Sequence, residues 1–177
     1  MTISLAIDTA TSRTIVGVIE DGKVLFEAFH EGATEHGFAI TELVTKALEI
    51  CRKPDQVVVG MGPGPFTGLR VGITFVHTFA LAREIPVIGV CSLDAIDIKQ
   101  SEYTVATDAR RKEIYWAKYK DGVRVSGPAV SKPDEVSNFI IGQYPSLQKL
   151  VALSTAQNIT EPMYLRRPDA VPTAERT

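Results

Sequence analysis

The sequence predicts an α/β protein built from two half-domains with the same order of elements, β-β-β-α-β. Strand-like β-branched runs and Asp-Gly pairs recur in the same order around residues 1–60 and 103–153. In both halves the first strand-like run ends on an aspartate. The 177 residues are 45% hydrophobic and 23% charged, which suits a packed core and excludes an intrinsically disordered chain.

Three strands are expected in the first thirty residues. Ile3–Asp8 is a short apolar run, and Thr14–Ile19 is rich in β-branched residues. Lys23–His30 follows the pair Asp21-Gly22. Such a pair is typical of a tight β-hairpin turn, because both turn positions need positive φ.

Two helices and two buried strands should complete the first half. Apolar residues recur at steps of three and four along residues 34–51 and again along residues 69–84. The apolar runs at 56–60 and 86–90 lack polar alternation, as in strands buried on both faces. Ser92 suits the N-cap of a short helix that ends near residue 98.

The second half repeats this order. Strands are expected, with an Asp-Gly turn before the third, at residues 103–108, 114–119 and 123–130. A helix should begin at residues 132–135, where a proline and two acids occupy the first turn. The apolar run 147–153 is expected as the closing strand.

We divide the chain into an N-terminal lobe, residues 1–100, and a shortened C-terminal lobe, residues 101–177. The segment from Glu161 onward is rich in proline and charge and has no sustained periodicity. We expect this segment to lie as an extended tail on the surface.

Bulk properties exclude several kinds of protein. The formal net charge of −2 gives no field that would attract a nucleic-acid backbone by itself. Cys51 and Cys91 are far apart, so no disulfide framework or zinc knuckle is implied. The sequence shows no signal-peptide pattern and no apolar run of about 18 residues. We therefore expect no membrane association and a cytoplasmic location.

A glycine-rich loop, GMGPGPFTG at residues 60–68, joins an expected strand to an expected helix. Glycines allow close approach of another backbone or of a phosphate, and Thr67 could cap the helix. Two features favour a purely structural connection: Pro63 and Pro65 remove amide donors, and no lysine follows as in a P-loop.

The helix expected at residues 69–84 is apolar over roughly 200° of its circumference, wider than the stripe of roughly 100–140° that a sheet-covering helix buries. Phe38 lies off the main apolar stripe of the other helix. Excess apolar surface usually marks an interface, although the two helices could instead satisfy each other and the sheet. The candidate interface residues are Phe38, Ile40, Leu43, Leu69, Gly72, Ile73, Phe75, Val76, Phe79 and Ala80.

Five strings resemble the TsaB/YeaZ family, in the family's order and along the whole chain. They are LAIDTAT (5–11), GMGPGPFTGLRVG (60–72), IGVCSLDA (88–95), DARRKEIYWAKY (108–119) and EPMYLR (161–166). The string GPGPFTGLRVG is the most specific of them. The resemblance implies an actin-like ATPase fold, as in acetate kinase, actin and Hsp70, with a second lobe shorter than the family usually has.

The resemblance also implies a function. Family members are non-catalytic paralogues of TsaD, the subunit that transfers threonylcarbamoyl to the tRNA adenosine beside the anticodon. We therefore expect a non-catalytic scaffold that dimerises with a TsaD-like transferase through its first-lobe helices and is joined by a TsaE-like ATPase. tRNA would be reached through the complex, and the isolated chain would form a homodimer. No cofactor of its own is expected, with ATP or ADP and magnesium left open at the interface of the complex.

Proteins of the wider superfamily clamp a nucleotide between their lobes, using the aspartates that end the first strand of each half. The corresponding residues here are Asp8 and Asp108, and each could instead cap the turn after its strand. With the glycine-rich loop, the candidate nucleotide-binding residues are Asp8, Thr9, Gly62, Gly64, Thr67, Gly68 and Asp108.

Two catalytic alternatives are a small-molecule kinase or ATPase of the same fold and a metallopeptidase. Asp8 is not followed by the D-x-G pattern common in active kinases of this fold. No H-E-x-x-H motif occurs, and the H-x-x-x-H metal pair of the transferase paralogue is reduced to His36 and Ile40. We expect no metal site and no enzyme activity, with His36 as a surface or capping residue.

Overall fold

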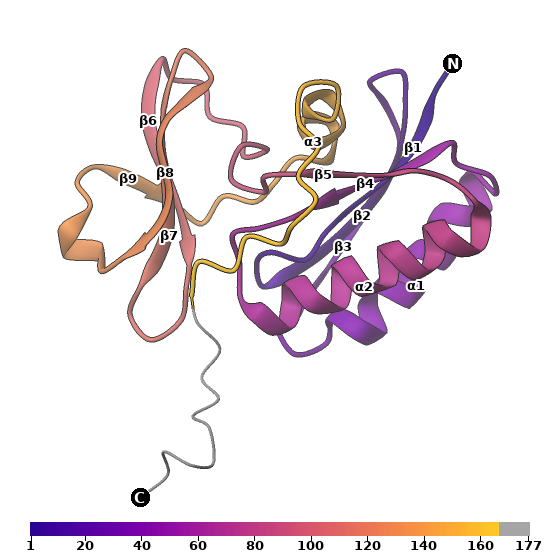
Figure 1. The fold of residues 1–177 in the computed structure, drawn as a ribbon, viewed down its shortest axis with the longest axis horizontal. Coiled ribbons are helices and arrows are strands. Elements are labelled where there is room, and N and C mark those ends of the chain that lie inside the picture. Colours follow the sequence, from indigo (N-terminus) through magenta and orange to yellow (C-terminus); the bar gives the residue numbers. More distant parts are fainter. Residues whose placement is uncertain (167–177) are drawn as a thin grey trace, which may run out of the picture.

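The computed structural model describes residues 1–166, which form two mixed β-sheets side by side (Figure 1). The first sheet has the strand order β3-β2-β1-β4-β5, and the second has the order β8-β7-β6-β9. In both sheets the first three strands are antiparallel and a later strand joins the first in parallel. This shared order confirms the predicted α/β class and its duplication.

The first sheet forms from the runs expected for strands. Its members are β1 (Ile3–Asp8), β2 (Arg13–Glu20), β3 (Lys23–Glu31), β4 (Gln56–Gly60) and β5 (Val87–Val90). Strands β2 and β3 meet at Asp21-Gly22, where φ is 45° and 83°, as the predicted tight turn requires.

Two helices, α1 (His36–Ile50) and α2 (Phe66–Arg83), cover the same face of this sheet (Figure 1). In α1 the buried apolar residues follow the expected three- and four-residue steps, from Ala39 to Ala47. Helix α2 begins three residues earlier than predicted, because Pro65 ends the preceding loop and stands at its N-cap. None of the helices in residues 1–166 combines the length and apolarity needed to cross a bilayer.

The opposite face of the first sheet is covered by α3 (Leu147–Leu153). The sequence predicted a strand here, and that prediction is wrong. Ser146 caps the helix by accepting a hydrogen bond from the amide of Lys149 at 3.3 Å. Leu147 and Leu150 then fall on one helical face and are fully buried against β2, so burial on the first sheet selects the helix.

The second sheet contains β6 (Glu102–Asp108), β7 (Ile114–Lys120), β8 (Val123–Ser131) and β9 (Phe139–Ile141). The helix predicted from residue 132 is only a 3-10 turn, η1 (Pro133–Glu135). β9, which the sequence did not predict, takes the place of the closing strand. The short helix predicted after Ser92 is a series of turns instead.

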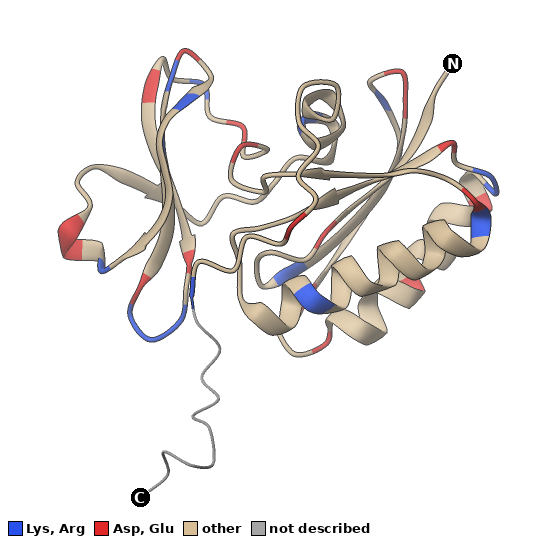
Figure 2. Ribbon diagram, viewed as in Figure 1, with Lys and Arg blue, Asp and Glu red and all other residues tan. Residues whose placement is uncertain are grey.

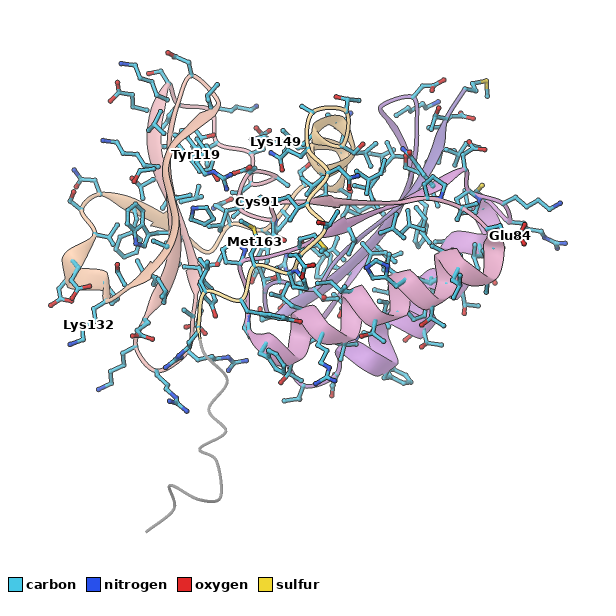
Figure 3. The ribbon with its side chains drawn as sticks, in the orientation of Figure 1. Glu84, Cys91, Tyr119, Lys132, Lys149 and Met163 are labelled. Carbon is cyan, nitrogen blue, oxygen red and sulfur yellow. The ribbon has the colours of Figure 1, made fainter. Side chains whose placement is uncertain are left out.

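The segment after α3 returns along the edge of the first sheet. The amide of Ile159 donates to the carbonyl of Gly89 at 2.8 Å, and the amide of Met163 donates to that of Met61 at 2.8 Å. Met163 also packs against the cluster that contains Cys91 and Tyr119 (Figure 3). The predicted tail therefore docks back on the chain as far as Arg166, and residues 167–177 lie outside the described residues.

Substitution of Gly89 should disrupt the contact between β5 and the segment that follows α3. A Cβ at Gly89 would overlap the carbonyl oxygen of Ile159, so Gly89→Ala should lower the free energy of unfolding by about 1–3 kcal/mol. Proteolysis should also become faster within residues 157–166. Urea denaturation and limited proteolysis measure both effects.

Gly37→Ala is the matched control, because a Cβ there meets nothing within 4 Å. It should be neutral or slightly stabilising, since alanine favours a helix more than glycine does. Equal stability of the two variants would contradict the docking.

Candidate functional site

A cleft of about 590 Å³ lies between the glycine-rich loop and the tip of the β6–β7 hairpin. Its walls come from four parts of the chain: residues 11–36, the start of α2, the hairpin tip and the C-terminal segment. The lining residues are Thr11, Ala33, Thr34, His36, Gly64, Pro65, Phe66, Thr67, Gly68, Ala109, Arg110, Arg111, Tyr115, Tyr164 and Arg166.

The start of α2 forms one wall of the cleft. No side chain caps this helix, so the amides of Phe66, Thr67 and Gly68 have no intrahelical acceptor. The prediction that Thr67 caps the helix is wrong, because Thr67 lies inside its first turn. Gly68 allows close packing, since a Cβ there would lie 2.7 Å from the carbonyl oxygen of Thr9.

Asp8 is fully buried beneath the glycine-rich loop. Its carboxyl group accepts hydrogen bonds from the Ser92 hydroxyl at 2.6 Å and the Ala10 amide at 2.9 Å. Burial raises the pKa of Asp8 to about 6, and these two hydrogen bonds only partly offset that effect. Asp8 therefore supports the loop and does not line the cleft.

The other nucleotide-binding candidates separate into two groups. Gly64, Thr67 and Gly68 line the cleft. Thr9 and Gly62 are buried supports, since Thr9 donates to the Gly68 carbonyl at 2.9 Å and the Gly62 amide donates to Ser92 at 3.2 Å.

Asp108 is exposed and caps its own turn by accepting from the Arg110 amide at 3.0 Å. It lines a neighbouring cavity of about 150 Å³. Since Asp8 is buried, the two strand-end aspartates do not form the expected pair across the cleft.

His36 is a cleft residue that sequence reasoning placed wrongly. Its side chain is not at the surface: the residue is only 4% exposed, and Nδ1 lies 2.8 Å from the Thr14 hydroxyl. Burial, followed by the charge of Arg110, lowers the pKa of His36, which favours the neutral ring. A signal in the sequence that could have placed His36 correctly is its position, since a polar residue there falls on the buried stripe of α1.

Basic residues form the facing wall. Arg110, Arg111 and Lys112 are consecutive and all have positive φ, between 52° and 63°, a conformation that costs energy for residues other than glycine. Figure 2 shows this basic hairpin tip below the second sheet.

The C-terminal segment borders the same cleft. The Arg166 guanidinium donates to the Ala109 carbonyl at 2.9 Å and pairs with Glu113 at 3.3 Å. The Tyr164 ring packs on Phe66 with ring centroids 4.8 Å apart. The segment thus contacts the start of α2 and the second sheet together.

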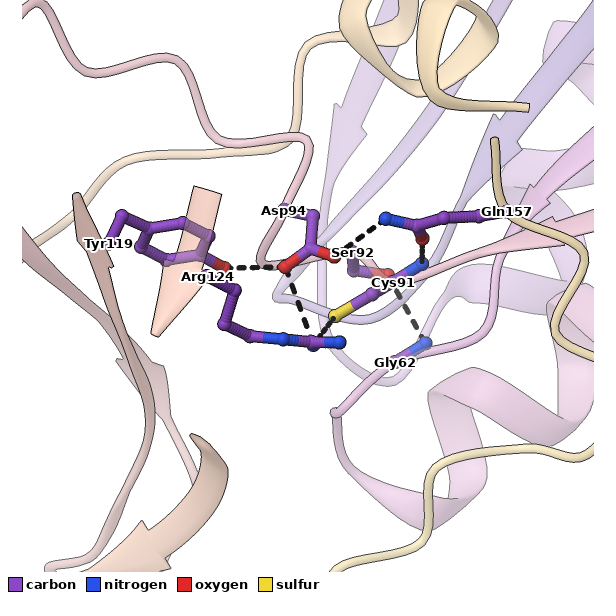
Figure 4. Close-up of polar contacts among 7 residues, drawn as sticks. All are labelled: Gly62, Cys91, Ser92, Asp94, Tyr119, Arg124 and Gln157. Carbon is purple, nitrogen blue, oxygen red and sulfur yellow. Dashed lines mark hydrogen bonds and ion pairs between the residues drawn. The ribbon is translucent and has the colours of Figure 1, made fainter. Parts of the chain in front are cut away.

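A polar junction centred on Asp94 joins the two sheets (Figure 4). Asp94 accepts from the Tyr119 hydroxyl at 2.7 Å and from the Gln157 amide at 2.8 Å, and it pairs with Arg124 at 3.4 Å. Arg124 also donates to the Cys91 sulfur at 3.2 Å. Burial, together with the charge of Asp94, raises the pKa of Cys91 to about 11, so the thiol is protonated at neutral pH and is a poor nucleophile.

The predicted interface residues are mostly inside the protein. Seven of the ten are buried in the chain's own core: Ile40, Leu43, Leu69, Gly72, Ile73, Val76 and Ala80. Much of the apolar circumference of α2 is thus explained by its contact with the sheet and α1. Phe38 is 70% exposed, while Phe75 and Phe79 are partly buried and their rings stack. Leu81, which the prediction omitted, is 81% exposed.

A family model described as "TsaD: tRNA N6-adenosine threonylcarbamoyltransferase" matches residues 30–170. The chain belongs to the TsaD family. It is 35% identical over 128 residues to the tRNA threonylcarbamoyladenosine biosynthesis protein TsaB of Escherichia coli, covering 66% of this chain and 54% of that protein. These matches confirm the TsaB/YeaZ resemblance.

Other relatives match most of the chain. An uncharacterised protein of Mycobacterium tuberculosis is 40% identical over 199 residues, covering 96% of this chain and 94% of that protein. An uncharacterised protein of Mycobacterium leprae is 41% identical, and the chain spans 57% of its length. The alignment with the M. tuberculosis protein is 199 positions long, whereas this chain has 177 residues. The M. tuberculosis protein therefore contains more than twenty residues that this chain lacks.

Solved structures agree with the fold. YeaZ from Pseudomonas aeruginosa superposes with a TM-score of 0.74 at 22% identity, over 88% of this chain and 92% of that one. A protein described as similar to peptidase YeaZ, from the same organism, gives a TM-score of 0.80 at 22% identity, over 94% and 100%. At this identity the likeness concerns the fold alone.

The pKa of Asp8 generates a prediction about stability. Since the folded-state pKa is about 6 and the ordinary value is 3.8, the folded protein binds the proton more tightly than the unfolded chain. The free energy of unfolding should therefore fall as pH rises between these values and then level off, by up to about 3 kcal/mol.

Asp8→Asn keeps an acceptor oxygen and should remove the part of the pH dependence of the free energy of unfolding that comes from Asp8. Urea denaturation of both proteins from pH 4 to pH 7 measures the difference. Parallel pH profiles would show that Asp8 ionises equally easily in the folded and unfolded chains and would refute its buried role.

Proposed function

We propose that the chain is a non-catalytic accessory subunit in the biosynthesis of tRNA threonylcarbamoyladenosine, acting as a partner of a TsaD-type transferase in the cytoplasm. The observation that carries the proposal is the outer face of α1 and α2 in a chain of the TsaD family. Phe38 on α1 and Leu81 on α2 are largely exposed, and the stacked rings of Phe75 and Phe79 on α2 are only partly buried. Exposed apolar surface on adjacent helices is typical of a protein interface.

The partner should have the same fold. Two related chains can bring equivalent helix pairs together about an approximate twofold axis, so a surface that pairs with a paralogue also suits a second copy of itself. We therefore expect a homodimer when the chain is alone and a heterodimer when the transferase is present. A TsaE-type ATPase would join that pair, and any ATP or ADP with magnesium would be held at the interface of the complex rather than by this chain alone.

A supporting role without catalysis agrees with the state of the reactive groups. Asp8 is buried and bound to Ser92. Cys91 is held as a protonated thiol beside Arg124. The net charge of −2 favours a role in which tRNA contacts come mainly from the partner subunits.

Reconstitution tests the function directly. The chain should restore tRNA modification when mixed with the transferase, the ATPase subunit, tRNA, threonine, bicarbonate and ATP, and should be required for full activity. On its own it should not hydrolyse ATP with magnesium. Hydrolysis by the chain alone would favour the alternative of an actin-like ATPase or kinase, and full modification without the chain would overturn the proposal.

Phe38→Glu should weaken pairing with the transferase by at least about tenfold, because it places a charge at an apolar contact. Stability should change little, since Phe38 is exposed. Val123→Glu is the matched control, because Val123 is 67% exposed on β8, away from both helices. Sedimentation or co-purification measures pairing, and equal pairing by both variants would rule out this face.

Val76 is unsuitable for this test, although the sequence placed it at the interface. It is fully buried in the core, so a charged residue there should unfold the protein rather than only prevent pairing.

A further inference from the structure

Within residues 1–166 the chain passes between the two sheets three times. The first crossing, residues 91–101, links β5 to β6, and the second, residues 142–146, links β9 to α3. The third is the segment 157–166, which leaves α3 on the first sheet and runs to the second sheet (Figure 1). The first two crossings are covalently continuous at both ends with a sheet or a helix, whereas the third is tied in this way only through α3.

The first two crossings meet at one place. Ile96 and Pro145 form an isolated β-bridge, and the Ser146 amide donates to the Ala95 carbonyl at 2.9 Å. The Lys149 ammonium donates to the Ile96 carbonyl at 2.8 Å from the first turn of α3. Two connections that touch at one place form a natural hinge, because one sheet can turn relative to the other with few backbone changes.

The third crossing is held on the first sheet by its backbone. The amides of Ile159 and Met163 donate to the carbonyls of Gly89 and Met61, both at 2.8 Å. These carbonyls belong to the end of β5 and to the residue after β4. The segment therefore lies along the edge of the sheet without becoming a regular strand of it.

The same segment is held on the second sheet by side chains. Met163 and Leu165 pack against the apolar cluster built from β6 and β7. The Arg166 guanidinium donates to the carbonyl of Ala109, at the start of the hairpin tip, and pairs with Glu113 on its other side. The far end of the segment thus fixes the base of the hairpin tip.

Gln157 connects the beginning of the segment to the polar junction between the sheets (Figure 4). Its side-chain oxygen accepts from the Cys91 amide at 3.1 Å, and its side-chain amide donates to Asp94 at 2.8 Å. Asp94 is the residue that Tyr119 and Arg124 of the second sheet contact. Loss of Gln157 would leave the buried Asp94 carboxylate with fewer donors, which weakens the whole junction.

The space between the sheets is filled by connecting segments. Among residues 1–166, no member of α1, α2 or β1–β4 belongs to the apolar cluster that covers β6 and β7. Apart from the strands of the second sheet, this cluster consists of residues from the first crossing and from the segment 157–166. The position of the second sheet therefore depends on these two segments rather than on direct packing of one sheet against the other.

We propose that residues 157–166 are a latch that holds the second sheet against the first, and that their release lets the second sheet turn at the place where residues 91–101 and 142–146 meet. The segment can open more easily than either sheet, because it has few backbone hydrogen bonds and its apolar side chains are only partly buried. Opening would change the distance between the start of α2 and the hairpin tip while both sheets stay folded. The inference does not rest on the proposed function, because it needs neither the transferase nor tRNA.

A matched pair of variants in the full chain tests the latch. Met163→Asp places a charge in the apolar cluster and should release the segment. Thr160→Asp adds the same charge at an exposed position of the same segment and should change nothing. Hydrogen–deuterium exchange should become about tenfold faster or more in residues 157–166 and in both other crossings of Met163→Asp, with β1 and β6 still protected.

Two results of this exchange experiment would overturn the proposal. Unchanged exchange in Met163→Asp would show that the segment is not held through the cluster. Equal loss of protection in both sheets would show that the chain opens as one cooperative unit and has no separate latch.

Small-angle X-ray scattering measures the movement of the second sheet itself. Met163→Asp should have a larger radius of gyration than the native chain and than Thr160→Asp, while far-UV circular dichroism stays unchanged. An unchanged radius of gyration in a variant whose segment exchanges rapidly would contradict the hinge.

Arg166→Gln is a milder variant that acts at the far end of the latch. It removes the ion pair with Glu113 and the guanidinium contact with the Ala109 carbonyl, and it adds no charge to the apolar cluster. Exchange in residues 157–166 should rise about threefold or more, with both sheets protected. Exchange equal to that of the native chain would contradict the holding role of Arg166.

Discussion

The arrangement of the two sheets depends on the hydrogen bonds and the ion pair made by the Asp94 carboxylate. It binds Tyr119 and Arg124 of the second sheet and Gln157 of the C-terminal segment. Removing one partner of a buried charged network is costly, because the remaining groups stay desolvated without compensation. The junction therefore determines where the hairpin tip stands relative to α2, and with it the shape of the cleft.

The first sheet contributes two different surfaces. On one face, α1 and α2 bury a continuous apolar core and leave Phe38 and Leu81 exposed outward. At the carboxyl end of β4, the glycine-rich loop brings the start of α2 against His36 and Thr9. The outer surface suits another protein, and the loop forms one wall of the cleft.

Much of the fold could be predicted from the sequence where local signals agreed. The strands joined at Asp21-Gly22 combine β-branched runs with a turn that allows one geometry. The run Leu147–Leu153 gave no such agreement, because a short apolar stretch fits either a strand or a helix. The uncovered face of the first sheet selects the helix, and that face exists only once the strands have assembled.

The candidate site was predictable only in part, for the same reason. The glycine-rich loop was visible as a string, whereas the role of His36 depends on Thr14, which lies on a different element. The apolar arc of α2 indicated an interface, but burial by the sheet and α1 accounts for Ile73 and Val76.

We expect this chain to meet a transferase of its own family through the outer face of α1 and α2. Hydrogen–deuterium exchange of the chain, with and without that transferase, tests whether these helices form the contact. Exchange should be slower in residues 36–50 and 66–83 in the complex, with the second sheet little changed. Slowing confined to the second sheet, or none at all, would contradict it.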